Sequence, residues 1–351
     1  MQIESAILST IVYFDNFDFA LTPEEIFQFL WKNNSALEDC YGILRRLAEE
    51  DSIETRDSFY FLPGRSANVK RRQESVVPTE ERLRKAKFCA RLIDWLPFVR
   101  AIFVCNSVAA EMAVVKSDID LFIVTAEGRI WFVRFFTNLF LKLFRLRTHA
   151  GHSAGHICLS FFATEKNLNL APWRVADDDI YLAIWLKQLL PVYDPGQRIY
   201  KKIQSENIWV NEFLPNANLI PRLGGVGVGW PTSSNPPPAL RPTPPKRGLP
   251  IQLGNLFEKY LKNWQMARLR PELLESAKVG GVDVVLNDGI LKFHSNDARE
   301  QIRKKWLEKC LVIVGLDSPL GRGRGGLVNI VEPTPGLEAD PAQAGNLQND
   351  N

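Results

Sequence analysis

Cysteine and histidine are scarce in this chain of 351 residues, which holds five of the former and four of the latter. No two cysteines form a Cys-x-x-Cys pair, and they are far apart in the sequence: Cys40, Cys89, Cys105, Cys158 and Cys310. An odd number of scattered thiols excludes a disulfide framework and a zinc knuckle, and it favours a reducing compartment. We therefore expect reduced, buried thiols in a cytoplasmic protein.

The chain also lacks a strong charge of either sign and a long uninterrupted hydrophobic run. Its net charge is +3 and 46% of its residues are hydrophobic, as in ordinary globular proteins. The first residues include acids and no basic segment, so they do not predict a signal peptide. The most apolar stretch, 130–146, is short for a membrane span and contains three basic residues. We expect a core-packing helix there, with an interfacial amphipathic helix as the alternative, and no membrane partner.

The first 65 residues predict three helices followed by a two-stranded hairpin. An apolar helix is expected over 3–14, and Thr22-Pro23-Glu24-Glu25 is the capping box of a second helix. Ser35 is the expected cap of a third helix, whose apolar stripe runs over 37–47. Two short strands flank the turn 56–58. This order resembles a winged helix-turn-helix domain.

Winged-helix domains bind either DNA or another protein, and the charges of the third helix bear on the choice. This helix carries two arginines, Arg45 and Arg46, among four acids: Glu38, Asp39, Glu49 and Glu50. Acidic side chains repel the phosphate backbone, so the helix is a poor reader of DNA. We assign residues 1–65 as a winged-helix-like domain with a weakly supported nucleic-acid partner.

A basic segment follows this domain. Residues 66–100 hold nine Lys/Arg and four acidic residues. Thr79 is the expected cap of a helix that runs to Leu96 with an apolar stripe. We assign 66–97 as a basic connecting helix, whose charged face is either simply solvated or a surface that receives a polyanion.

Alternating strands and helices predict a mixed sheet over residues 98–220. The expected strands are 99–105, 118–125 and 157–164. The expected helices are a short one after Asn106, the apolar one described above, and one over 177–190.

The remaining third of the chain divides by composition. Residues 221–250 contain nine prolines and five glycines and predict a linker. A helix over 253–270, a hairpin around Asn287-Asp288-Gly289 and a helix over 300–311 predict a helix-hairpin-helix region, 251–320. The tail, 321–351, is Gly/Pro-rich and then polar, and it predicts disorder.

Two aspartates, Asp118 and Asp120, carry the chemistry. On a strand, residues two apart point to the same face, so the two carboxylates project together. Like charges at this spacing repel unless divalent cations neutralise them, and oxygen ligands suit Mg²⁺. Ions held here can clamp a triphosphate and lower the pKa of an attacking hydroxyl. The alternative is an exposed strand face with two solvated acids.

A second small motif lies upstream of the aspartates. Asn106-Ser107 follows an apolar strand and precedes the expected short helix. The serine hydroxyl and the first amides of that helix can hold the outer phosphates of a nucleotide.

The order of strand, Asn-Ser, short helix and Ser-Asp-Ile-Asp resembles the nucleotidyltransferase superfamily that includes DNA polymerase β and kanamycin nucleotidyltransferase. The resemblance implies an α+β fold: a winged helix, then a mixed sheet with flanking helices over 98–220, a helical and hairpin C-terminal region, and a disordered tail. It implies two Mg²⁺ ions and an NTP substrate. The implied catalytic metal ligands are Asp118 and Asp120, and the implied nucleotide-binding residues are Asn106, Ser107 and Ser117.

The sequence departs from this superfamily at two positions. Asn106 stands where the family has glycine, but asparagine tolerates left-handed backbone better than most residues. The third acidic residue, which the family carries on a neighbouring strand, is missing, and Ser160 is expected in its place. Losing a positioned base typically costs about a hundred- to ten-thousandfold in rate.

A histidine cluster near residue 150 has a spacing that suits a metal on a helix. Two glycines interrupt it, so a loop that enters a strand is expected instead, without a metal. The histidines are His149, His152 and His156. The first of them, with Arg145 and Arg147, predicts a basic rim facing a triphosphate.

We therefore expect a magnesium-dependent nucleotidyltransferase that moves a nucleoside monophosphate from an NTP to an acceptor: a protein hydroxyl, a small molecule or an RNA end. The alternative is a catalytically degenerate domain that senses nucleotide while the winged helix contacts DNA or a partner; the missing acid favours it. A third hypothesis is a toxin–antitoxin nucleotidyltransferase partner.

Overall fold

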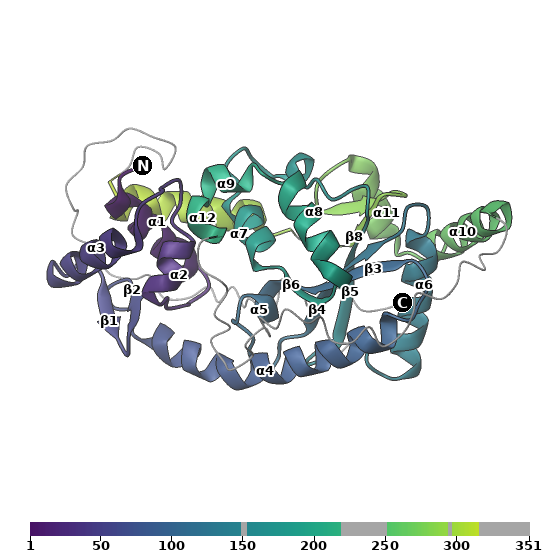
Figure 1. Cartoon of the computed structure of the whole chain (residues 1–351), viewed down its shortest axis with the longest axis horizontal. Coiled ribbons are helices and arrows are strands. Elements are labelled where there is room, and N and C mark those ends of the chain that lie inside the picture. Colours follow the sequence, from purple (N-terminus) through teal and green to yellow (C-terminus); the bar gives the residue numbers. More distant parts are fainter. Residues whose placement is uncertain (149–152, 219–250, 294–296, 316–351) are drawn as a thin grey trace.

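The computed structural model describes residues 1–148, 153–218, 251–293 and 297–315 (Figure 1). Within these ranges the chain is α+β, with twelve α-helices, a two-stranded sheet and a mixed six-stranded sheet. The expected linker, 221–250, the expected tail, 321–351, and the two histidines His149 and His152 lie outside the described residues.

Three helices and a hairpin form the N-terminal part, as predicted: α1 (Ile3–Asp15), α2 (Pro23–Gln28), α3 (Leu37–Glu49), β1 (Glu54–Arg56) and β2 (Phe59–Phe61). The capping box of α2 is confirmed. The Thr22 amide donates to Glu25 Oε2 over 2.9 Å, and the Glu25 amide donates to Thr22 Oγ1 over 3.3 Å. The hairpin turn uses Asp57 and Ser58, which both have left-handed backbone, with φ of 52° and 66°.

Two predicted helix starts are wrong. Ser35 does not cap α3, because its hydroxyl donates to Asn33 instead. Thr79 is not a cap either, since one helix, α4 (Ala67–Ile93), passes through Pro78 and joins the N-terminal hairpin to the sheet (Figure 1). A proline inside a helix removes a backbone hydrogen bond and normally ends it. Packing overrides that signal, because α4 is buried at one end against the hairpin and at the other against the sheet.

The six-stranded sheet has the order β6-β3-β4-β5-β8-β7, in which only the β4–β5 pair is parallel. The sequence predicts its three central strands and the final hairpin, but not that the hairpin extends the same sheet. Pro191 lies in the edge strand β6, where a missing amide donor is tolerated. The strands are β3 (Val99–Val104), β4 (Ile119–Thr125), β5 (Ile157–Thr164), β6 (Leu190–Tyr193), β7 (Val284–Leu286) and β8 (Ile290–Phe293).

Alternation along β4 divides the core into two layers, one on each face of the sheet. Ile119, Leu121 and Ile123 pack with α4, α6 and α11. Phe122 and Val124 pack on the other face, with the N-terminal helices and α7, α8, α9 and α12. The helices not yet given are α5 (Asn106–Ala109), α6 (Ile130–Leu143), α7 (Ile180–Gln188), α8 (Arg198–Glu206), α9 (Val210–Phe213), α10 (Ile251–Met266), α11 (Pro271–Val279) and α12 (Arg299–Ile313).

The apolar helix α6 packs in the core, as predicted, with Trp131 and Val133 fully buried. Its first turn is held by α10, because the Glu258 carboxylate accepts hydrogen bonds from the Trp131 and Phe132 amides over 2.8 and 3.0 Å. Across the described ranges, every helix is too short or too polar to cross a membrane.

The first and last described helices, α1 and α12, pack together. Trp306 on α12 is fully buried, and its indole Nε1 donates to the Ser9 carbonyl over 2.9 Å. Its ring meets Trp31 edge to face. Lys309 pairs with Asp15 over 2.7 Å. The N-terminal helices therefore share one core with the helices on the adjacent face of the sheet.

Candidate functional site

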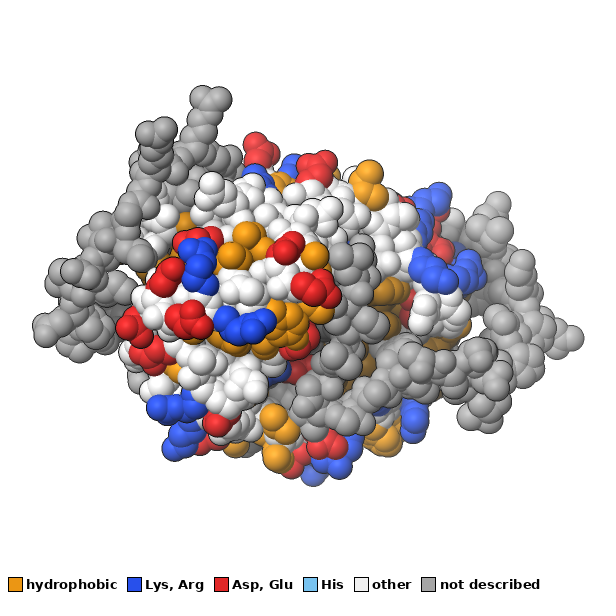
Figure 2. Space-filling view, turned by 60° about the vertical axis from the view of Figure 1, so that its left-hand side comes forward, with side chains coloured by type: hydrophobic (Ala, Val, Ile, Leu, Met, Phe, Trp, Pro, Cys, Tyr) orange, Lys and Arg blue, Asp and Glu red, His pale blue; other side chains and the backbone are white. Residues whose placement is uncertain are grey.

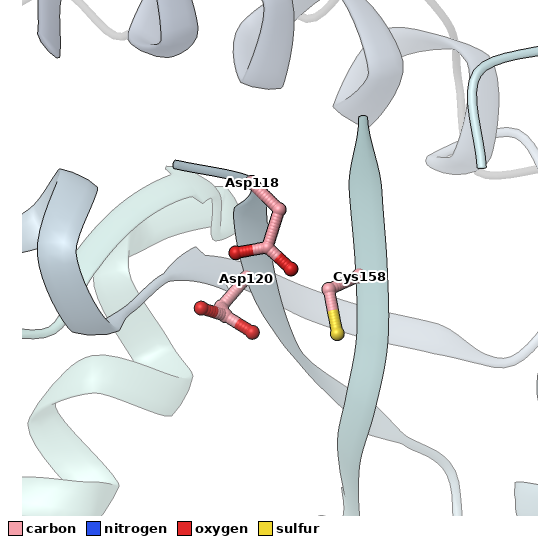
Figure 3. Close-up of side chains that lie close together, drawn as sticks. All are labelled: Asp118, Asp120 and Cys158. Atoms are coloured by element: carbon pink, nitrogen blue, oxygen red, sulfur yellow. The ribbon is translucent and has the colours of Figure 1, made fainter. Parts of the chain in front are cut away.

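The two aspartates of the motif lie at the start of the central strand β4. Asp118 directly precedes this strand and Asp120 is its second residue. Both side chains leave the strand on the same side (Figure 3), while Ile119 between them packs on the opposite face. The predicted side-by-side arrangement is therefore present. The carboxylates are little exposed, 9% for Asp118 and 6% for Asp120.

A cysteine on the next strand completes the group. Cys158 on β5 stands opposite Asp120 in the parallel β4–β5 register. The ligand atoms of Asp118, Asp120 and Cys158 all lie within 4.8 Å of one another (Figure 3). We call these three residues the carboxylate–thiol cluster. In the described part of the chain, no other three His, Cys, Asp or Glu side chains are placed to share a metal ion.

Ser160, expected where the family has its third acid, does lie at Asp120. The polar side chains of Asn106, Cys158 and Ser160 lie beside the Asp120 carboxylate and favour its charged form. The β4–β5 register shifts between Asp120 and Phe122. Cys158 could not be identified from the sequence alone, because its place depends on the pairing of two strands that are separated by a helix.

The Asn106-Ser107 turn lies directly beside the aspartates. Asn106 has left-handed backbone with φ of 54°, as its place in the expected glycine position requires. The Trp185 indole Nε1 donates to Asn106 Oδ1 over 2.9 Å, and the Asn106 side chain favours the charged form of Asp120. Ser107 follows in the one-turn helix α5 and is half-buried. The two motifs that the sequence suggested are thus in contact.

The loop before Asp118 is held by a buried arginine, Arg82, that no sequence motif indicates. Arg82 on α4 donates through Nε to the Ser117 carbonyl over 2.9 Å. It also donates to the Val115 and Pro78 carbonyls. The Ser117 hydroxyl accepts from the Val114 amide over 3.0 Å, so this side chain shapes the loop. Arg82 and Ser117 therefore set the position from which Asp118 projects.

Burial raises the pKa of both carboxyl groups. For Asp118, burial and then the nearby Asp120 charge raise the pKa to about 8, although Arg82 opposes the rise. For Asp120, burial raises the pKa, and the polar side chains of Asn106, Cys158 and Ser160 oppose the rise. Asp118 Oδ2 is buried with no hydrogen-bond partner among the described residues. Two buried carboxyl groups within 4.8 Å of each other, with one oxygen unsatisfied, are the chemistry that a bound cation resolves.

The other acids near this region of the sequence are engaged elsewhere. Glu165 pairs with Arg100 over 3.2 Å. Asp178 pairs with Arg303 over 2.6 Å, and Asp179 pairs with Arg299 over 3.0 Å. No third carboxylate from the described ranges joins the carboxylate–thiol cluster.

Of the predicted basic rim, Arg145 and Arg147 lie within the described residues and His149 lies outside them. The backbone of Arg147 forms an isolated parallel β-bridge with Ile157 at the start of β5. Its side chain interacts electrostatically with Cys158. Burial is the main cause that lowers its pKa. Arg145 is exposed and has left-handed backbone, with φ of 54°. His156 places a ring nitrogen 3.0 Å from the Ala154 carbonyl oxygen and belongs to the loop that enters β5, as predicted.

Comparisons of this chain with protein-family models, with curated proteins and with solved structures found no match.

Proposed function

We propose that the protein binds a nucleoside triphosphate with a divalent cation and transfers the nucleoside monophosphate to an acceptor. One observation carries this proposal: two adjacent carboxylates, Asp118 and Asp120, meet the Asn106-Ser107 turn at one end of β4. The first pair supplies ligands for a cation, and the second supplies polar groups for the phosphates that such a cation accompanies.

The chain order around the site supports a nucleotidyltransferase arrangement. The antiparallel strands β3 and β4 are joined by the short helix α5, and β5 is parallel to β4 after α6. Asp118 directly precedes the second of these strands and Asp120 lies on it, while the Asn-Ser turn follows the first. This is the order that the resemblance implies.

The residues present suit one divalent cation. Mg²⁺ is commonly held by one or two carboxylates together with substrate phosphates. Asp118 Oδ2 has no hydrogen-bond partner among the described residues, so it is available as a ligand for such an ion. Such a cation neutralises phosphate charge and lowers the pKa of an attacking hydroxyl. Asp118 and Asp120 would hold it, Asn106 would fix the Asp120 carboxylate, and Ser107 would contact a phosphate. A second ion lacks a further carboxylate within the described residues.

The acceptor hydroxyl also lacks a carboxylate base there. Cys158 and Ser160 occupy the place beside Asp120. Without a positioned base we expect slow transfer, about a hundred- to ten-thousandfold below that of a complete site. This observation favours a second candidate function, a domain that binds nucleotide and signals its presence without turnover.

The N-terminal part supports a protein-contacting winged helix more than a DNA reader. Arg46 on α3 pairs with Glu4 and with Glu50, so two acids engage it. On the face shown in Figure 2, acidic and basic side chains of the described residues are interspersed. A polyanion prefers a continuous basic surface. In fluorescence-anisotropy titrations of the full chain with duplex DNA, we expect only weak binding that salt abolishes.

The test of the proposed function measures binding and turnover separately. The full chain is incubated with each α-labelled NTP and a divalent cation, either Mg²⁺ or Zn²⁺, and products are resolved by chromatography, while nucleotide affinity is measured by calorimetry. We expect metal-dependent binding of a nucleotide and slow transfer, both lost in Asp118→Asn and retained in the control Asp177→Asn, an exposed acid outside the cluster.

Tight binding without any product would select the nucleotide-sensing function. If the chain neither binds nor transfers nucleotide, or if wild type and Asp118→Asn behave equally, the transferase function and the nucleotide-sensing function are both refuted.

A further inference from the structure

The donor set of the site contains a sulfur atom in addition to the carboxylate oxygens. The side chains of Asp118, Asp120 and Cys158 converge from two adjacent strands, and their ligand atoms lie within 4.8 Å of one another. Three protein ligands at this mutual distance are enough to bind one cation while a further coordination position stays open.

Strand register places Cys158 in the cluster. It stands opposite Asp120 in the β4–β5 ladder and is partly exposed, whereas Ser160 is buried. Figure 3 shows its sulfur on the same side of the sheet as the two carboxylates. A neighbouring thiol, Cys105, is turned away from this role, since its Sγ donates to the Asp120 backbone carbonyl over 3.6 Å.

A separate observation indicates that the cluster is built for a ligand. Asp118 is only 9% exposed, and its Oδ2 has no hydrogen-bond donor within the described residues. Arg82, the nearby cation, donates its hydrogen bonds to backbone carbonyls. A buried carboxylate oxygen without a donor is costly, so a cation is the partner that this oxygen lacks.

We infer that Cys158 is the third protein ligand of the cation, and that the site therefore prefers a thiophilic divalent ion such as Zn²⁺ to Mg²⁺. This inference rests on the cation site of the proposed function and narrows the choice of ion. Carboxylate oxygens alone suit Mg²⁺, whereas a thiolate selects softer ions such as Zn²⁺.

Binding through sulfur requires the thiolate. The Cys158 S–H bond breaks as the metal–sulfur bond forms, the sulfur keeps the electron pair, and the proton leaves to solvent. The two carboxylates supply the other ligands, and the fourth position is available to a phosphate oxygen of the nucleotide.

The test uses Cd²⁺ as a spectroscopic probe of thiolate ligation. The full chain is stripped with a chelator and titrated with Cd²⁺ while the ultraviolet thiolate-to-cadmium charge-transfer band is recorded. We expect the band in wild type, its loss in Cys158→Ser, and its retention in Cys105→Ala. Because losing even a supporting partner of a metal ligand weakens binding by about 10–100-fold, we expect at least a tenfold weaker Cd²⁺ affinity in Cys158→Ser.

A second variant, Cys158→Asp, replaces sulfur by oxygen. Competition between Zn²⁺ and Mg²⁺ is then measured by calorimetry, with circular dichroism to confirm that each variant is folded. We expect the preference for Zn²⁺ to fall at least about tenfold in this variant.

A wild-type chain without the band, or a Cys158→Ser chain that keeps it, overturns the inference. These readouts do not depend on nucleotide transfer. If the wild-type chain shows the charge-transfer band but no nucleotide transfer, only the proposed function is contradicted. If it transfers nucleotide but shows no band, only the role of Cys158 is contradicted.

Discussion

At the scale of single residues, the site depends on buried carboxyl groups that have too few partners. Asp118 has one oxygen without a donor, and burial together with Asp120 raises the pKa of its carboxyl to about 8. The metal-free native state therefore holds a proton that the unfolded chain, with a pKa of about 3.9, releases.

Metal-free protein should lose stability as the pH rises. Because the native state binds more protons than the unfolded state between these two pKa values, the free energy of unfolding decreases by up to about 1.4 kcal/mol per pH unit. Urea unfolding in chelator, at about pH 5 and about pH 8, measures this change. The variant Asp118→Asn should reduce it, leaving the contribution of Asp120, and Asp177→Asn should leave it unchanged. A wild-type chain that becomes more stable over this range contradicts the assignment.

The buried guanidinium of Arg82 has a positioning role. It donates to the carbonyls of Pro78, Val115 and Ser117, next to Asp118. Arg82→Met removes three hydrogen bonds, although the Ser117 carbonyl keeps the Gly155 amide as a donor, and each lost hydrogen bond typically costs about 0.5–1.5 kcal/mol. We expect a loss of at least about 2 kcal/mol in urea unfolding and weaker Cd²⁺ binding.

Arg84→Met, which changes an exposed arginine of the same helix, is the matched control and should alter neither quantity. If Arg82→Met binds Cd²⁺ as tightly as wild type, Arg82 stabilises the loop without positioning Asp118.

Much of the site could be predicted from the sequence at this scale. The period of two along a strand predicts that Asp118 and Asp120 project together, and the left-handed tolerance of asparagine is confirmed at Asn106. Cys158 and Arg82 could not be predicted, since each reaches the site through pairing or packing with a distant segment.

At the scale of secondary-structure elements, packing decides where local signals conflict. Pro78 and Thr79 together predict a helix start, yet α4 is continuous because both of its halves are buried against other elements. Leu190 falls at the end of a predicted helix but begins β6, because β3 offers an unpaired edge. Strong local signals such as the capping box of α2 survive unchanged.

The contact between α10 and α6 provides a test at this scale. Glu258 accepts from two amides in the first turn of α6, the role that a capping side chain normally has from within its own helix. Glu258→Ala should destabilise the protein by about 1 kcal/mol, a typical cost of losing a cap. Urea unfolding measures this loss, and faster hydrogen exchange of the Trp131 and Phe132 amides locates it.

Glu258→Gln keeps an acceptor oxygen and should lose less stability. Equal losses in the two variants would show that the negative charge, and not the hydrogen-bond geometry, holds α10 against α6.

At the scale of the whole molecule, one hydrophobic core connects the N-terminal helices with one face of the sheet. The sequence predicts the N-terminal part as a unit, but no local pattern predicts that α12 packs on α1. This contact joins Ser9 and Trp306, 297 positions apart. The final hairpin likewise joins the sheet at β5.

This shared core predicts a single unfolding transition for the described part of the chain. Trp306→Ala removes a fully buried ring that contacts both Trp31 and the Ser9 carbonyl, and such truncations cost about 3–5 kcal/mol. The loss should appear equally in near-ultraviolet circular dichroism and in tryptophan fluorescence during urea unfolding. Trp95→Ala, at a ring that is 56% exposed, is the control and should have a small effect. Two separate transitions in wild type would contradict a shared core.

The pairing of α1 with α12 also has a consequence for biosynthesis. A ribosome that adds about 5–20 residues per second needs roughly 15 to 60 seconds to make the stretch between Ser9 and Trp306. During that interval the edge of Trp31 and the part of α1 that Trp306 covers stay open, so the nascent N-terminal helices are a natural target for a holding chaperone. Release becomes favourable only when the tryptophan of the last described helix emerges from the exit tunnel and covers them.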